Sequence, residues 1–248
     1  SYAQQLMDQY GDTYKANGIG LDTLKRFERI LIKSNDLLEM CYGIDGETPV
    51  SDAELTSHLE DEMVYIRYVV VPLYNTSTYA FADDDQKAQM LTLAQQAATA
   101  VNLASNESAS EQVSALNAAA QAALPDIYAV LDSETSDDSA SVQTELLTES
   151  DVASAFTQDG AADALRSLSY GEAAAVQING STLLLMVRVD PLSVSSLDDL
   201  RSQILSDMKG GELDDALAAG GAELAHDLDS SAMNKLPAKK IVNNSANS

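Results

Sequence analysis

The stretch LSYGEAAAVQINGSTLLLMVRVD, residues 168–190, decides the fold. Two short runs of strand-forming residues, 173–178 and 182–189, flank the dipeptide Asn179-Gly180. Asn-Gly between such segments is a strong short-range signal for a β-hairpin. An isolated hairpin is only marginally stable in water, so it needs a third strand or a helical cover. We therefore expect another part of the chain to supply that strand.

The segment VYIRYVVVPLY, residues 64–74, is the best candidate for the additional strand. It is dense in β-branched and aromatic residues, which favour strands, and Pro72 stops it. Just upstream, the tetrapeptide Ser-Asp-Ala-Glu at 51–54 is a capping box, which marks the start of a helix. We predict a strand at 64–71 that pairs with the hairpin at 173–189.

Helices are expected to form most of the remaining chain. Periodicity, capping signals and breakers predict helices at 2–17, 21–42, 51–63, 84–124 (two helices, the second ending at Pro125), 151–168 and from 197 onward, with a short strand at 142–148. The Gly-Gly pairs at 210–211 and 220–221 are interpreted as helix breaks. The predicted class is α+β, with a mixed β-sheet covered by helices.

The predicted helix at 21–42 carries an apolar stripe that needs a partner to cover it. The stripe is formed by Leu21, Leu24, Phe27, Ile30, Leu31, Leu37, Leu38 and Cys41. Because the chain has a single cysteine, it cannot form an intramolecular disulfide, and we interpret that cysteine as a small buried apolar residue.

The charge balance limits the classes of partner. The 248 residues include 39 acidic and 14 basic side chains, giving a net charge of -25. Binding to a phosphate backbone depends on Lys and Arg, so nucleic acid is a poor candidate. No run approaches the roughly 18 apolar residues of a membrane span. We expect a solvated acidic surface.

Two longer segments resemble the parvulin-type peptidyl-prolyl isomerases, specifically the PrsA/SurA class of extracytoplasmic foldases and chaperones. The segment ALRSLSYGEAAAVQINGSTLLLMVRVD, residues 164–190, is similar to that family's helix, Gly-Glu turn and hairpin. The segment VSDAELTSHLEDEMVYIRYVVV, residues 50–71, is similar to the helix that leads into its central strand. The region from 50 to 190 that these two segments bound covers about half of the chain.

The resemblance implies a division into two domains. Residues 1–63 with 192–242 would form a discontinuous helical domain like the N-terminal domain of SurA, and 64–191 a parvulin-like domain. In this arrangement the helix at 197–208 would cover the apolar stripe of 21–42, and KLPAKKI at 235–241 resembles the usual end of the fold. Residues 243–248 are expected to be a frayed tail.

The sequence departs from the family at its catalytic positions. The isomerase pattern places one His on the first strand and another on the last, where this chain has Tyr68 and Thr182. The resemblance therefore implies a degenerate site with no assigned catalytic residue and weak isomerisation at most. Tyr68 shares a strand face with aliphatic residues. It has two interpretations: a buried core residue, or a residue that lines the substrate groove implied by the resemblance to the isomerases.

The residues expected to bind a polypeptide client in this groove lie on the first and last strands. They are Tyr65, Tyr68, Val70, Leu184 and Met186.

Other chemistries find little support. His58 lies between Glu54 and Glu62 at helical spacing, which surface charge pairing explains better than a metal site. His226 has still less context. The chain contains neither the G-x-S-x-G nucleophile elbow nor a Gly-rich phosphate loop. We expect no metal and no cofactor.

The leading hypothesis is an extracytoplasmic bacterial chaperone that holds unfolded or nascent polypeptide segments. Its alternatives are an active prolyl isomerase and a non-catalytic module for dimerisation or envelope assembly. The chain begins at Ser1 without a signal peptide, which suggests processing or truncation, and a cell-surface lipoprotein or secreted protein is expected. Contact with a membrane is expected only through an N-terminal lipid anchor, and a homodimer joined by swapped N-terminal helices remains an open alternative.

Overall fold

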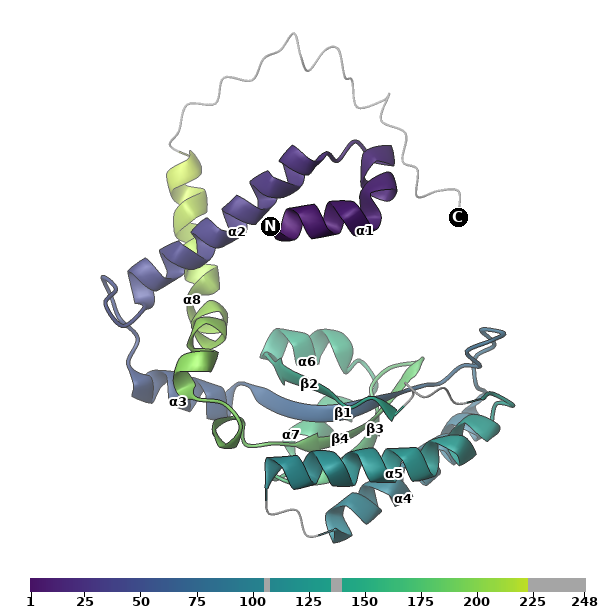
Figure 1. Ribbon diagram of the computed structural model, residues 1–248. Coiled ribbons are helices and arrows are strands. Elements are labelled where there is room, and N and C mark those ends of the chain that lie inside the picture. Colours follow the sequence, from purple (N-terminus) through teal and green to yellow (C-terminus); the bar gives the residue numbers. More distant parts are fainter. Residues whose placement is uncertain (105–107, 135–139, 223–248) are drawn as a thin grey trace.

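The computed structural model describes residues 1–104, 108–134 and 140–222 (Figure 1). A four-stranded sheet with helices on both faces lies below a group of helices contributed by the two ends of the chain. The α+β class is confirmed. The expectations for His226, 235–241 and 243–248 concern residues outside the described ranges.

The sheet has the strand order β2-β1-β4-β3. Its strands are β1 (Val64–Pro72), β2 (Gln143–Leu147), β3 (Ala173–Gln177) and β4 (Thr182–Arg188). β1 pairs with β4 along most of its length, and Val70 lies opposite Leu184. The predicted strand at 64–71 therefore completes the sheet, as one of its two central strands.

The hairpin between β3 and β4 forms as predicted, but its turn depends on a side chain. The carboxamide Oδ1 of Asn179 accepts a hydrogen bond from the backbone N–H of Ser181 at 2.9 Å. Among the described glycines, Gly18, Gly160 and Gly171 have a positive φ, and Gly180 does not. The Asn residue thus stabilises the turn by mimicking a backbone turn, without a left-handed glycine.

All three strand pairs of the sheet are antiparallel, so the expectation of a mixed sheet is wrong. The reason lies in the connection between β1 and β2, which consists of two helices, α4 (Asp84–Leu103) and α5 (Ala109–Ala129). They pack on each other as a hairpin and return the chain to the end where β1 finishes. β2 therefore starts there and runs in the opposite direction.

Three predicted helix boundaries are wrong. The helix expected at 151–168 is two short helices, α6 (Glu149–Ala155) and α7 (Ala161–Arg166), because the chain turns at Gly160 with a φ of 73°. α5 continues past Pro125 to Ala129. The last helix, α8 (Leu197–Ala222), also runs through both Gly-Gly pairs without a break.

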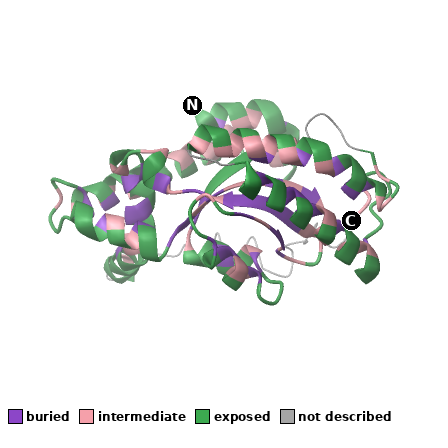
Figure 2. Ribbon diagram, turned by 90° about the horizontal axis from the view of Figure 1, so that it is seen from below, coloured by how far each residue is buried: buried purple, intermediate pink, exposed green. Residues whose placement is uncertain are grey.

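The two faces of the sheet have separate cores, and Figure 2 shows the strands as the most buried elements. α4 and α5 cover the face that carries Val69, Leu183 and Leu185. α6 and α7 pack on the other face, which carries Ile66 and Leu184. The period-2 alternation of β1 and β4 places successive residues in different cores.

A third core joins the two ends of the chain. It lies among α2 (Leu21–Tyr42), α3 (Asp52–Asp61) and α8, while α1 (Tyr2–Ala16) packs on α2 and a short 3-10 turn, η2 (Pro191–Ser193), precedes α8. Its buried residues are Leu38, Tyr42, Val50, Leu55, Leu59, Met63, Leu146, Leu200, Ile204, Leu205 and Leu213.

α8 covers the apolar stripe of α2 only in part. Leu38 is buried in the shared core, whereas Phe27 and Leu31 are 60% and 64% exposed. The expectation that α8 covers the whole stripe is therefore wrong. The reason is geometric. α8 crosses the C-terminal half of α2 at an angle and does not run alongside the whole of α2 (Figure 1).

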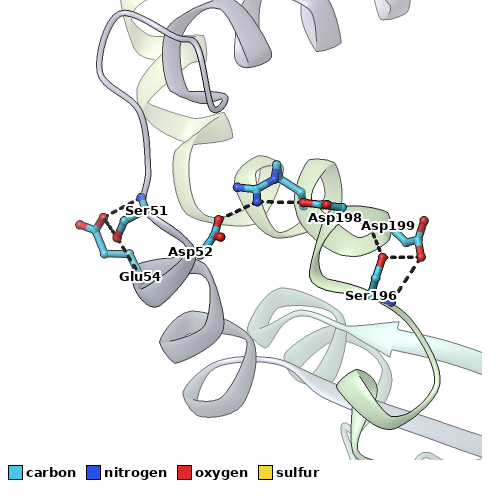
Figure 3. A network of polar contacts seen from close by, with 7 residues as sticks. Ser51, Asp52, Glu54, Ser196, Asp198 and Asp199 are labelled. Carbon is cyan, nitrogen blue, oxygen red and sulfur yellow. Dashed lines mark hydrogen bonds and ion pairs between the residues drawn. The ribbon is translucent and has the colours of Figure 1, made fainter.

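An ion-pair network also joins α3 to α8 (Figure 3). The buried guanidinium of Arg201 donates hydrogen bonds to Asp52 at 2.6 Å and to Asp198 at 3.0 Å. Next to it, the hydroxyl of Ser196 donates to Asp199 at 2.6 Å and accepts from the backbone N–H of Asp199, which caps α8. The network links residues 149 positions apart in the sequence.

Candidate functional site

A cavity of about 310 Å³ opens on the face of the sheet that α6 and α7 cover only in part. β1, β2 and β4 form its floor, and α6 with the loop before β4 forms its walls. The lining residues are Ile66, Tyr68, Val70, Glu145, Leu147, Asp151, Ser154, Ala155, Phe156, Ile178, Thr182 and Leu184.

The apolar floor follows from strand alternation. Ile66, Tyr68 and Val70 are two residues apart on β1, so their side chains point to the same face. Leu184 lies directly opposite Val70 on β4 and extends the same surface. The floor can therefore accept an apolar side chain of a ligand.

Tyr68 is a polar group on this apolar floor. Its hydroxyl donates a hydrogen bond to Oε2 of Glu145 at 2.9 Å. Burial first, and then the hydrogen bond and negative charge of Glu145, raise the pKa of Tyr68 to about 12. The phenol therefore stays protonated at neutral pH and cannot act there as a general base.

The rim of the cavity is acidic. Glu145 lies on β2, and the carboxylate of Asp151 accepts hydrogen bonds from the N–H and hydroxyl of Thr148 in the capping box of α6. In the described part of the chain, neither carboxylate forms an ion pair with Lys or Arg. The lining contains no basic residue. The rim thus favours a ligand that brings its own positive charge or hydrogen-bond donors.

The structure brings together some, but not all, of the residues expected from the sequence. Tyr68, Val70, Thr182 and Leu184 line the cavity, and Tyr68 is half-buried on its floor. Tyr65 lies on the opposite side of β1, against the core under α4 and α5 and the core at the chain ends.

Met186 also fails to line the cavity. It shares the face of Leu184 but is 0% exposed within the core beneath α7. Its burial places it under the neighbouring helices, so a ligand in the cavity would not contact it.

Sequence reasoning missed the acidic rim. Glu145 lies in the segment predicted as a strand, where it pairs across from Ile66 and therefore shares its face. The alternation of residues in 142–148 indicates that Glu145 and Leu147 share a face. Without the pairing partner of this strand, however, that face could not be assigned to the cavity. Thr148 and Asp151 form a capping box, another readable signal for where α6 begins.

The imidazole of His58 contacts a residue distant in sequence. Its Nε2 lies 2.7 Å from Oδ2 of Asp207 on α8. Across the described ranges, no cluster of three His, Cys, Asp or Glu residues could hold a metal ion. This contact is a further link between α3 and α8.

No helix in the described part of the chain combines the length and hydropathy required to cross a bilayer.

Comparison with known proteins gives a structural likeness but no match in sequence. No family model matches the sequence, and no curated protein matches it significantly. Among solved structures, the fold is similar to the foldase protein PrsA from Streptococcus pneumoniae, with a TM-score of 0.40 and 11% identity. The similarity covers 94% of this chain and 78% of that one. At this TM-score and identity, the likeness assigns no activity to this chain.

Proposed function

We propose that the protein is a foldase-like chaperone that holds extended polypeptide segments in the cavity beside Tyr68. The observation that carries the proposal is the cavity itself, which has an apolar floor and an acidic rim on a partly covered sheet face. Burying one aliphatic side chain of a client on such a floor is worth about 1.5–3 kcal/mol. This driving force is non-directional, so it suits clients of varied sequence.

The same residues argue against efficient prolyl isomerisation. Tyr68 and Thr182 stand where the family pattern has two His, and the Tyr68 hydroxyl is committed to Glu145. We propose that any isomerase activity is weak. A protease-coupled proline-peptide assay tests this: strong acceleration that is lost in Tyr68→Ala would favour the active isomerase instead.

The setting proposed for this activity is outside the cytoplasm. We propose a secreted or lipid-anchored protein in which residues 1–63 and 192–242, described by the structure up to residue 222, belong to one helical unit and 64–191 to a second. The net charge of -25 would keep a loaded complex soluble and attract basic nascent segments. The alternative of a non-catalytic interaction module, including a homodimer, would be favoured by tight self-association without any effect on client aggregation.

The principal test is an aggregation assay with an unfolded client and the variant Val70→Glu. The added carboxylate places a charge on the apolar floor of the cavity, so we expect about a tenfold weaker suppression of aggregation. Val70 is half-buried, which gives the new side chain access to water and should preserve folding.

The matched control is Gln95→Glu, which adds the same charge on an exposed position of α4, beyond the opposite face of the sheet. Circular dichroism and thermal unfolding would show that both variants are folded. Wild-type protein that fails to suppress aggregation, or equal activity of the two variants, would overturn the proposal.

A further inference from the structure

Three aromatic rings gather in the loop that connects β1 to α4. Tyr74 and Tyr79 are stacked with ring centroids 6.3 Å apart, and Phe81 meets Tyr74 edge-on at 5.9 Å. Tyr79 is 73% exposed and Phe81 is 68% exposed. Segment 73–82, with sequence LYNTSTYAFA, carries no charge. We call Tyr74, Tyr79 and Phe81 the aromatic cluster.

Hydrogen bonds of the Asn75 side chain hold the loop that carries the cluster in place. The side chain of Asn75 donates to the carbonyl of Leu131 at 2.9 Å and accepts from the N–H groups of Ser77 and Thr78, both at 2.9 Å. Tyr79 has a φ of 58°, an unusual backbone conformation for a bulky residue. A ligand that contacts the exposed rings would meet a preorganised surface and would lose little entropy to loop ordering.

The aromatic cluster lies on the same face of the sheet as the cavity. Leu73 and Ala82 are buried in the core under α4 and α5, and they pair through a backbone hydrogen bond of 2.9 Å. Their neighbours Tyr74 and Phe81 form the adjoining bridge pair and therefore point to the opposite face.

The spacing between the cavity and the cluster can be read from β1. Val70 lies on the cavity floor, and Tyr74 follows four residues later on the same face. β1 ends at Pro72 and the chain bends at Leu73, so an extended rise of roughly 3.3 Å per residue sets an upper limit of about 13 Å between Val70 and the start of the cluster. Thr182, opposite Pro72, lines the cavity at the end of β1 from which the cluster loop begins.

We propose that the aromatic cluster is a second subsite for an extended polypeptide whose first anchor occupies the cavity. This inference rests on the proposed function and specifies its substrate class. The preferred segment has an aliphatic residue for the cavity and an aromatic or prolyl residue four positions away for the exposed rings. Rings of this kind stack on such side chains.

The charge of the cavity rim further restricts which polypeptide segments can bind. Glu145 and Asp151 line the cavity, whereas the cluster loop is neutral. A Lys or Arg next to the aliphatic anchor would therefore pair with the rim, and Asp or Glu there would be repelled. The occupant is a neutral or basic polypeptide with two apolar anchors.

The test compares two labelled peptides by fluorescence anisotropy. Both contain Leu next to Lys, and one of them also contains Phe four positions from the Leu. We expect the two-anchor peptide to bind roughly fivefold to tenfold more tightly. The double variant Tyr79→Ser with Phe81→Ser should abolish this advantage and leave the one-anchor peptide unaffected.

The matched control is Tyr2→Ser, which removes an exposed ring from α1. Val70→Glu should weaken binding of both peptides. If Val70→Glu weakens binding while the double variant retains the advantage of the second anchor, the inference fails and the proposed function stands. If neither peptide binds the wild-type protein, the proposed function fails as well.

A second readout does not depend on losing an interaction. The chain contains no Trp, so Phe81→Trp introduces a single fluorescent reporter into the cluster. We expect its emission to shift to shorter wavelength when the two-anchor peptide is added, and to stay unchanged with the one-anchor peptide. Identical emission with both peptides would overturn the inference.

Discussion

The two faces of the sheet differ in how completely helices cover them. On one face, α4 and α5 contain 20 and 21 residues and bury Leu183 and Leu185 completely. On the other, α6 and α7 contain 7 and 6 residues and leave a cavity of about 310 Å³. The same strands supply both faces. Both faces carry a core, but helix length and placement leave the face under α4 and α5 closed and the face under α6 and α7 open to a ligand.

The closed face is also packed with small residues. Ala94, Ala98 and Ala120 are buried where α4 and α5 meet the sheet, which allows close approach of the helix backbones. The open face instead has larger side chains, such as Phe156 and Ile178, at its walls. This difference in packing predicts that substitutions on the closed face lower stability more than substitutions on the open face.

The largest expected effect comes from neighbouring leucines on β4. Leu185 points to the closed face and Leu184 to the cavity. Leu185→Ala should lower the free energy of unfolding by about 3–5 kcal/mol and Leu184→Ala by about 2 kcal/mol, because the cavity already leaves one side of Leu184 open. Urea unfolding followed by circular dichroism measures both. Equal losses would contradict the contrast between the faces.

A smaller effect is expected at the break between α6 and α7. Gly160 has a φ of 73°, so Gly160→Ala should cost about 1–2 kcal/mol of stability. The control is Gly180→Ala in the hairpin turn, where an added Cβ meets nothing within 4 Å and φ is not positive. That variant should change the free energy of unfolding by less than about 0.5 kcal/mol. If Gly180→Ala lowered the free energy of unfolding as much as Gly160→Ala does, this account of the two turns would be wrong.

The smallest effect concerns Tyr68 and pH. Its raised pKa means that its contribution to stability is complete below about pH 10 and is lost as the pH rises toward about 12. Glu145→Gln removes the negative charge and should move the pKa of Tyr68 back toward 10. The difference between the tyrosinate absorbance titrations of the wild type and Tyr68→Phe isolates this group. A midpoint near 10 in the wild type would show that Glu145 and burial do not act on it.

Short-range signals predicted much of the sheet. The Asn-Gly hairpin, the β-branched segment at 64–71 and the capping box at Ser51 all appear where the sequence places them. These features depend on residues close together in the chain, so local patterns suffice. The pairing of the strand at 64–71 with the hairpin was also predictable, since a lone hairpin needs a partner strand.

Features that depend on tertiary packing were not predictable in the same way. The Gly-Gly pair at 210–211 stays helical in α8, next to the buried Leu213. The exposure of Phe27 depends on the angle at which α8 crosses α2. Glu145 became a cavity residue only through the pairing of β2 with β1. None of these relations can be read from periodicity alone.

The ion pair between Asp52 and Arg201 has a consequence for how the chain is made. Synthesis proceeds from the N-terminus, so α2 and α3 emerge well before α8 can cover them. β4 ends at Arg188, so the sheet can form first and draw the two flanking segments together, which reduces the entropic penalty of closing such a long loop. The nascent protein would thus present its own uncovered apolar helices until α8, which begins at Leu197, has emerged, and would itself need shielding during its biogenesis.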